Sequence, residues 1–307
     1  MAASAVSARS RQATEADPDM TEPGAAPDNS QIAGSRFGDT ARRVASAVLL
    51  APIALISAWA GGWVFAGMLA IAAIAMALEV CHLVYRSTHP LDALGLIFAV
   101  LLAIVFAASG LPSAALALTA AIMAFALAGR LWREKPVGQV LIAYPYLVLP
   151  FVALIWLRND PSYGLEAVFW LLVMVWAIDS FAYFAGRTIG GPKLMPSISP
   201  KKTWAGLIGG MLGAVAAGVA AALMIGVGSP ILLGIVSAGL AVVEQLGDFY
   251  ESAMKRRAGL KDSGHLIPGH GGMLDRVDGL IAVTVGAALL GIIHNAAQPA
   301  AGVLIWP

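Results

Sequence analysis

Apolar stretches long enough to cross a lipid bilayer follow one another along most of this 307-residue chain. A spanning helix needs about 20 mostly apolar residues, and its backbone polar groups must be hydrogen-bonded within the segment. The stretch 112–129 is short and 230–250 is polar at its end, so eight spans is the alternative to nine. The pattern predicts an all-α, polytopic integral membrane protein with about nine transmembrane helices, at residues 44–60, 62–84, 93–110, 112–129, 139–157, 166–186, 204–227, 230–250 and 277–295.

The first 41 residues follow a different pattern. They are rich in Ala, Ser, Pro, Asp and Glu and show no apolar periodicity, which is typical of a disordered segment. No apolar core precedes a cleavage site there, so we expect the first apolar helix to act as the insertion signal. The predicted organisation is a disordered tail (1–41), N-terminal transmembrane helices (42–160) and a C-terminal transmembrane region with the candidate catalytic residues (161–307).

Composition agrees with a membrane protein and excludes several functions. Hydrophobic residues make up 59% and charged residues 12%, whereas a soluble domain carries about 25% charged residues. A net charge of +1 argues against nucleic-acid binding. The single cysteine, Cys81, excludes an intrachain disulfide, and the chain has neither the HExxH motif of zinc hydrolases nor a P-loop.

Lysine and arginine predict the orientation in the membrane. With nine helices and a cytoplasmic N-terminus, Arg158 is the one cation of residues 42–307 that falls in an outer loop. The two long polar loops, 187–203 and 251–276, then face the cytoplasm. We expect a bacterial-type inner or plasma membrane protein whose N-terminus and active site are cytoplasmic.

Four carboxylates within predicted spans are candidates for function: Glu79, Asp179, Glu244 and Asp248. A charge at this depth costs about 2.5–3.5 kcal/mol on insertion scales and usually marks a functional interior. Glu244 and Asp248 are four residues apart and share one helix face, which Ser252 extends. Pairing with a nearby Lys or Arg for structural reasons is the alternative, and it is strongest for Glu79.

Asp275 and Asp278 are three residues apart at the start of the last span, again on one face. Three carboxylates on adjacent helix ends suit a hard cation, and Mg²⁺ needs only one or two carboxylates plus substrate phosphates. We predict a magnesium site formed by Asp248, Asp275 and Asp278, with or without a second cation.

The loop between these carboxylates contains five glycines, several cations and His270. Glycine lets a backbone approach phosphates closely, and the next helix begins with unpaired N–H groups. His270 is interpreted as a phosphate donor, a general base or a turn residue. Together these features indicate phosphoryl or nucleotidyl transfer, in which catalysis is mostly positioning and charge stabilisation.

The other inner loop ends in "SPKKT", which places the Ser199 and Thr203 hydroxyls beside Lys201 and Lys202. These residues can bind phosphate groups. The alternative is a positive-inside anchor with lysines that extend to the interface.

At these residues the sequence resembles the phosphatidate cytidylyltransferase (CDP-diacylglycerol synthase) family. Its signature, S-x-hydrophobic-K-R-x4-K-D followed by P-x-H-G-G-x-x-D-R-x-D, is filled from Ser252 to Asp278. A second block, D-[ST]-x-A-Y-x-x-G-R with SPKKT, matches from Asp179 to Thr203. The N-terminal half matches mainly in hydropathy and in Glu79. The second block usually continues T-x-E-G, but Ala205 stands where the glutamate is expected.

The resemblance implies a transferase that joins CTP to phosphatidate, in a membrane lipid environment and as a homodimer. With the loops described above, it gives these predicted roles: catalytic Asp248, Asp275, Asp278, Lys255, Arg256, Lys261 and His270; substrate-binding Ser199, Lys201, Lys202, Thr203, Ser252, Asp262 and Arg276; supporting Glu79, Asp179 and Glu244.

Three other functions are alternatives to this one. A CDP-alcohol phosphotransferase or a lipid kinase would use related chemistry, but the former should show D-G-x2-A-R-x8-G-x3-D-x3-D, which the chain lacks. A proton-coupled transporter predicts inverted repeats, and the polar residues cluster at one end of the helices instead. A catalytically impaired paralogue is suggested only by Ala205.

Overall fold

The computed structural model describes residues 50–86, 90–226, 228–264 and 271–307. Eight helices in these ranges are long and apolar enough to cross a membrane, which confirms the expected all-α integral membrane protein. In chain order these are α2 (Gly62–Val80, continued by the π-helical turn η1, Cys81–Tyr85), α3 (Pro90–Ala108), α4 (Pro112–Trp132), α5 (Gly138–Arg158), α6 (Gly164–Thr188), α7 (Trp204–Ile225), α8 (Pro230–Ala258) and α9 (Leu274–Asn295).

The first predicted span, 44–60, is described only in part. Its described residues form a shorter apolar helix, Leu50–Ala60. The tail 1–41 lies outside the described residues, as does His270. The boundary predicted near residue 160 stays a prediction, and one hydrophobic cluster includes side chains from both sides of it.

Several helix ends differ from the prediction, and two of these differences affect the candidate site. Helix α8 runs to Ala258 rather than 250, and Gly259 in the left-handed conformation (φ 74°) ends it. Ser252, Lys255 and Arg256 therefore stand on the helix. Helix α9 begins at Leu274 rather than 277, which places Asp275 in its first turn.

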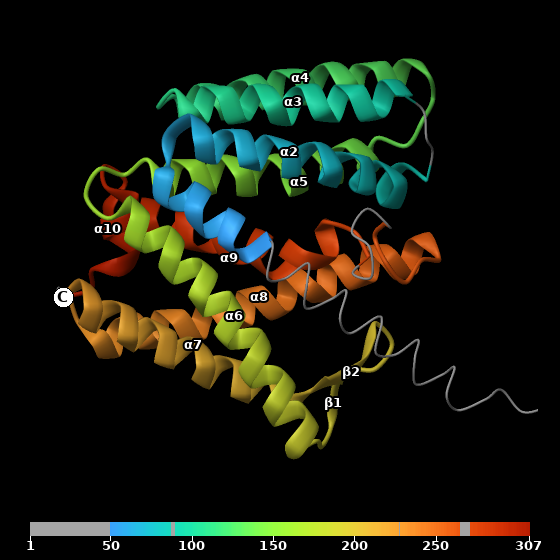
Figure 1. The fold of residues 1–307 in the computed structure, drawn as a ribbon. Coiled ribbons are helices and arrows are strands. Elements are labelled where there is room, and N and C mark those ends of the chain that lie inside the picture. The colour runs from blue at the N-terminus through green and yellow to red at the C-terminus, as the bar shows by residue number, and fades with distance from the viewer. Residues whose placement is uncertain (1–49, 87–89, 227, 265–270) are drawn as a thin grey trace, which may run out of the picture. The chain divides into compact units, whose positions relative to one another are not determined.

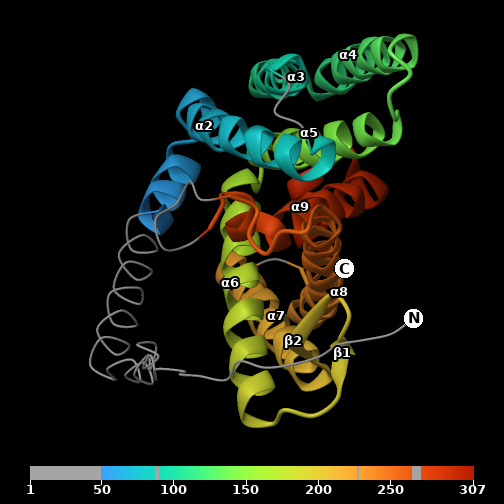
Figure 2. The ribbon, with the colours of Figure 1, turned by 90° about the vertical axis from the view of Figure 1, so that its right-hand side faces the viewer.

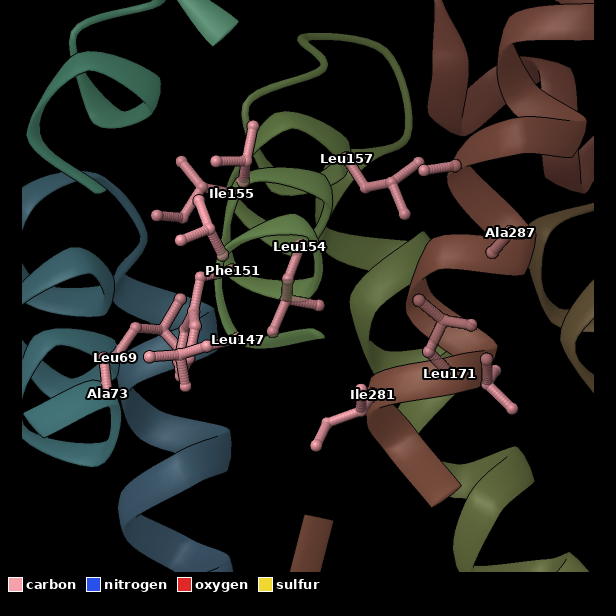
Figure 3. Packing of buried hydrophobic residues seen from close by; sticks show 14 of the residues in the cluster. Leu69, Ala73, Leu147, Phe151, Leu154, Ile155, Leu157, Leu171, Ile281 and Ala287 are labelled. Atoms are coloured by element: carbon pink, nitrogen blue, oxygen red, sulfur yellow. The ribbon is translucent and has the colours of Figure 1, made fainter. Parts of the chain in front are cut away.

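The helices lie in layers around α5 (Figures 1 and 2). Helices α3 and α4 pack on one side of the α2–α5 pair, while α9, and beyond it α8 and α7, lie on the other side. Figure 3 shows how α5 links the layers, with Leu147 and Phe151 beside Leu69 and Ala73 of α2. Burial of such leucines and phenylalanines fixes the position of α5 between the two groups of helices.

Helices α8 and α9 approach each other closely because glycine stands at their contact. A Cβ atom added at Gly247 of α8 would lie 2.4 Å from the Cβ of Ala282, and one added at Gly279 of α9 would lie 2.7 Å from Glu244 Oε1. Small residues at such contacts allow close approach of membrane helices. The acidic faces of the two helices are thereby brought together.

Among the described residues, strands occur only in a short antiparallel hairpin, β1 (Lys193–Met195) and β2 (Ser199–Thr203), between α6 and α7. Thr203 ends β2 and is the N-cap of α7, since its Oγ1 accepts a hydrogen bond from Gly206 N at 3.1 Å. The hairpin therefore fixes Lys201 and Lys202 directly before the start of α7.

The C-terminal residues form α10 (Pro299–Leu304), which is buried throughout. Asp160, which follows the end of α5, accepts a hydrogen bond from Ala300 N at 2.9 Å, and only 6% of its surface is exposed. A buried carboxylate thus caps this short helix.

Candidate active site

Lys202 and Asp248 join the hairpin to α8. The Lys202 ammonium donates to Asp248 Oδ2, and Ser252 Oγ donates to Asp248 Oδ1 at 3.2 Å. The side chains of Lys202 and Asp248 keep 25% and 20% of their surface exposed, so a ligand can reach them. The structure thereby brings together the hairpin and α8, which were predicted from the sequence to share one site.

Carboxylates from three helices surround this pair. Asp179 of α6, Glu244 and Asp248 of α8, and Asp278 of α9 act electrostatically on one another and on Lys202. Arg276 also acts on Asp179. The four carboxylates outnumber these two cations, and a cation bound among them would offset their mutual repulsion.

Asp275 points into its own loop rather than toward this group. Its Oδ1 accepts from Lys255 Nζ at 2.6 Å. Its Oδ2 accepts from Ser263 N, Ser263 Oγ and Gly272 N, each at 2.9 Å. Both oxygens thus accept from protein donors, and the carboxylate holds Ser263 and Gly272 together.

Lys255 is also committed to a structural contact. Its ammonium lies 2.6 Å from Glu251 Oε2 and 2.6 Å from Asp275 Oδ1, and its side chain is 12% exposed. The Glu251 side chain is fully buried, and its Oε1 has no hydrogen-bond partner among the described residues. In this conformation Lys255 orients Asp275 and is not free to bind a triphosphate.

Sequence reasoning missed Glu251 and Ser263. The four-residue spacing between Glu251 and Lys255 was a usable signal for the ion pair. Nothing local to Ser263 indicated its contacts, since its hydroxyl bonds Asp275 and Glu79, the latter 184 residues away.

Glu79 reaches from α2 to the start of α9. Its Oε1 accepts from Met273 N at 2.8 Å, and its Oε2 accepts from Leu274 N at 2.8 Å and from Ser263 Oγ at 3.1 Å. The residue is only 6% exposed. The carboxylate therefore caps the N-terminus of α9, where backbone N–H groups and the helix dipole favour negative charge. Glu79 therefore pairs with backbone N–H groups rather than with the Lys or Arg side chain that the alternative expected.

The glycines of the loop leave room for these carboxylates. A Cβ atom added at Gly272 would lie 2.1 Å from Ser263 Oγ and 2.6 Å from Glu79 Cδ. Gly271 has φ +83°, which side chains rarely adopt, and an added Cβ would lie 2.7 Å from Asp275 Oδ2. Both positions require glycine for the loop to close around Glu79 and Asp275.

The remaining predicted residues lie around the site. Arg256 contacts the carbonyls of Ile198 and Leu260, at 3.5 and 3.4 Å, so it ties α8 to the hairpin. Ser199 is half-buried, and Thr203 is buried as the cap of α7. The exposed residues of this set are Lys201, Arg256, Lys261, Asp262 and Arg276.

The three carboxylates predicted to bind one metal are not gathered around a common point. Among the residues that the structure describes, no group of three or more acidic, histidine or cysteine side chains has the arrangement of a metal site. Asp248 and Asp278 remain neighbours, whereas Asp275 is turned to Lys255 and Ser263. Asp248 and Asp278 are then the remaining candidate ligands, and Asp248 also accepts hydrogen bonds from Lys202 and Ser252. One or two carboxylates completed by ligand oxygens are sufficient for Mg²⁺.

Comparison with known proteins agrees with this picture. Residues 41–293 match the Cytidylyltransferase family. The chain is 48% identical over 141 residues to a phosphatidate cytidylyltransferase of Brucella abortus, covering 45% of this chain and 51% of that protein. It is 40% identical over 175 residues to that of Haemophilus influenzae (52% and 59%), and 42% identical over 148 residues to that of Bacillus subtilis (48% and 55%).

The aligned regions span about half the length of these relatives. The family match itself is longer, since it includes α2 to α8 entirely and nearly all of α9, and with them Glu79, Lys202, Asp248 and Asp275. By this match the chain belongs to the Cytidylyltransferase family.

Proposed function

We propose that this protein transfers a cytidylyl group from CTP to phosphatidate. A phosphate oxygen of phosphatidate attacks the α-phosphorus of CTP, and the bond from the α-phosphorus to the α–β bridging oxygen breaks. The products are CDP-diacylglycerol and pyrophosphate. The proposal rests on family membership, on the names of the relatives and on the arrangement of charges described above.

The observation that carries the proposal is the meeting of Lys202 with carboxylates from α6, α8 and α9 at one partly exposed place. An ammonium and an acidic group that can recruit a cation are together suited to a polyphosphate, whose transfer depends on charge neutralisation. The start of α7, directly after the hairpin, adds N–H groups that favour an anion.

Each residue then has a definite part. Lys202, with the exposed Lys201 and Arg276, would offset charge on the triphosphate or on the lipid phosphate. The phosphate of phosphatidate is already ionised at neutral pH, so the reaction does not depend on a strong general base. Lys255 and Glu79 would act indirectly, by holding Asp275 and the start of α9 in place.

We propose that Mg²⁺ is held by Asp248 and Asp278, with substrate phosphates as further ligands. When bound, the ion would neutralise the triphosphate and draw electron density from the α-phosphate. Asp275 would join as a ligand only after its bonds to Lys255 and Ser263 are released. A second cation and a homodimer also stay proposals.

The site is proposed to face the cytoplasm, where CTP is available, in a bacterial-type inner or plasma membrane. The bias of Lys and Arg toward one set of loops supports this orientation. Phosphatidate would then be taken from the inner leaflet.

The test is pyrophosphate release by the purified protein in phosphatidate-containing micelles with CTP and Mg²⁺. Asp278→Asn should lower turnover by on the order of 10²–10³, the loss typical of removing one stabilising electrostatic contact. Glu166→Gln is the matched control, because Glu166 is an exposed carboxylate in the first turn of α6, away from the site. Equal turnover in the two variants would refute the proposed site.

A second candidate, a catalytically impaired paralogue, is favoured only by Ala205. This residue lies in the first turn of α7, which carries no acidic residue. Wild-type protein that binds CTP without turnover would support this candidate against the first.

A further inference from the structure

A groove follows the contact between α3 and α4. Its larger part has a volume of about 700 Å³ and its smaller part about 240 Å³. The two parts share four lining residues, so they form one continuous depression: Leu91, Gly95, Ile122 and Phe125.

The larger part of the groove is apolar. Leu94, Phe98 and Phe125 line it and are 59%, 60% and 83% exposed. From Leu91 to Phe98 the lining extends about 10 Å along α3, at 1.5 Å per residue. Its shape and length suit part of an extended acyl chain lying between the two helices.

The smaller part of the groove, called its polar part below, contains the charged side chains of the lining among apolar ones and has a net positive charge. Arg130, buried at its end, pairs with Asp92 at 2.9 Å, donates to Gln139 Oε1 at 2.5 Å and lies 4.4 Å from the ring centre of Tyr85. Arg133, which ends α4, also lines this part and is exposed. Two guanidinium groups therefore stand against one carboxylate.

The polar end lies at the same end of α2 as the candidate active site. Tyr85, in the turn η1 that continues α2, lines the groove, and Glu79 one turn and a half earlier holds the start of α9. Helices α3 and α4 nevertheless lie on the opposite side of α2 and α5 from α8 (Figures 1 and 2). The polar part of the groove thus lies near the same end of α2 as the active site but is separate from it.

We propose that this groove binds one anionic glycerophospholipid. The phosphodiester lies beside Arg133 and the edge of Arg130, and an acyl chain lies along Leu94, Phe98 and Phe125. The order of an apolar channel followed by a positively charged pocket matches the order of chain and phosphate in such a lipid. The site is distinct from that of the proposed reaction and does not depend on it.

The test is native mass spectrometry of the delipidated whole protein titrated with phosphatidylglycerol or phosphatidylcholine. Wild-type protein should retain phosphatidylglycerol in preference to phosphatidylcholine. Arg133→Gln should weaken its retention about fivefold, the equivalent of about 1 kcal/mol for one cation at a lipid surface. Lys135→Gln is the matched control, because Lys135 is exposed close by in sequence but does not line the groove.

A second variant tests the groove itself. No atom lies within 4 Å of a Cβ built at Gly129, so Gly129→Leu can fold and should fill the polar part. It should reduce retention of both lipids. Retention unchanged by both Gly129→Leu and Arg133→Gln would overturn the proposal. A photocrosslinker placed at Phe125 that captures a second copy of the chain, rather than lipid, would also overturn it in favour of a subunit contact.

Discussion

Glu79 offers the sharpest test of how the loop before α9 is held. Glu79→Ala removes the acceptor for two backbone N–H groups and one hydroxyl. A buried donor left unpaired costs about 1–3 kcal/mol, so the two N–H groups alone should cost about 2–6 kcal/mol. Glu79→Gln keeps the shape of the side chain, and its amide oxygen can still accept from Leu274 N and Ser263 Oγ. Only the Met273 N–H then loses its acceptor, so this variant should cost only about 1–3 kcal/mol.

Besides the loss of overall stability, we expect a local effect at the start of α9. Hydrogen exchange at Met273 and Leu274 should accelerate in Glu79→Gln, because their N–H groups lose the charged acceptor. Turnover should also fall, because Asp275 and Asp278 lie just after Leu274 in α9 and depend on the position of this helix end. Thermal unfolding in detergent, exchange monitored by mass spectrometry and pyrophosphate release together measure these effects.

Asp160→Asn is the matched control. Asp160 is also a buried carboxylate that accepts a helix N-terminal N–H, but it caps α10 and contacts none of the predicted site residues. It should lower stability without accelerating exchange at Met273 or reducing turnover per folded molecule. If Glu79→Gln behaves in the same way as Asp160→Asn, the positioning role of Glu79 is refuted.

The other predictions concern single contacts in the site. Lys202→Met should lower turnover by on the order of 10², whereas Lys201→Met, at an exposed neighbour, should have a smaller effect; equal losses would contradict the special position of Lys202 beside Asp248. Gly272→Ala should destabilise the protein and lower turnover, because its Cβ would lie 2.1 Å from Ser263 Oγ. Gly67→Ala, with no atom within 4 Å, should be tolerated, and thermal unfolding of the two variants side by side measures the difference. Ala205→Glu should raise turnover if the expected carboxylate matters, and an unchanged rate would show that the position is free to vary.

Hydropathy was sufficient to predict the eight spans that the structure describes, because each long apolar stretch must hydrogen-bond its own backbone in lipid. The ends of α8 and α9 were less predictable. Helix α8 continues through "ESAMKRRA" because no residue breaks it before Gly259. Helix α9 begins earlier than its apolar run because Glu79, far away in sequence, accepts the N–H groups of Met273 and Leu274.

Motif reading predicted that the candidate site residues lie near each other, but it did not identify their hydrogen-bond partners. The pairing of "SPKKT" with the acidic face of α8 could be inferred from charge. The direction of the Asp275 side chain could not, because it depends on Ser263 and Gly272 in a loop whose path is set by Glu79. Glu251 was overlooked since it is not part of the family signature, although its spacing to Lys255 was informative.

The most direct test of the central claim is transfer of label from CTP to lipid. With CTP labelled at the α-phosphate, phosphatidate and Mg²⁺, the purified protein should move the label into the organic-soluble fraction and release unlabelled pyrophosphate in equal amount. Label that stays in the aqueous phase, with wild-type protein folded and CTP bound, would contradict the account.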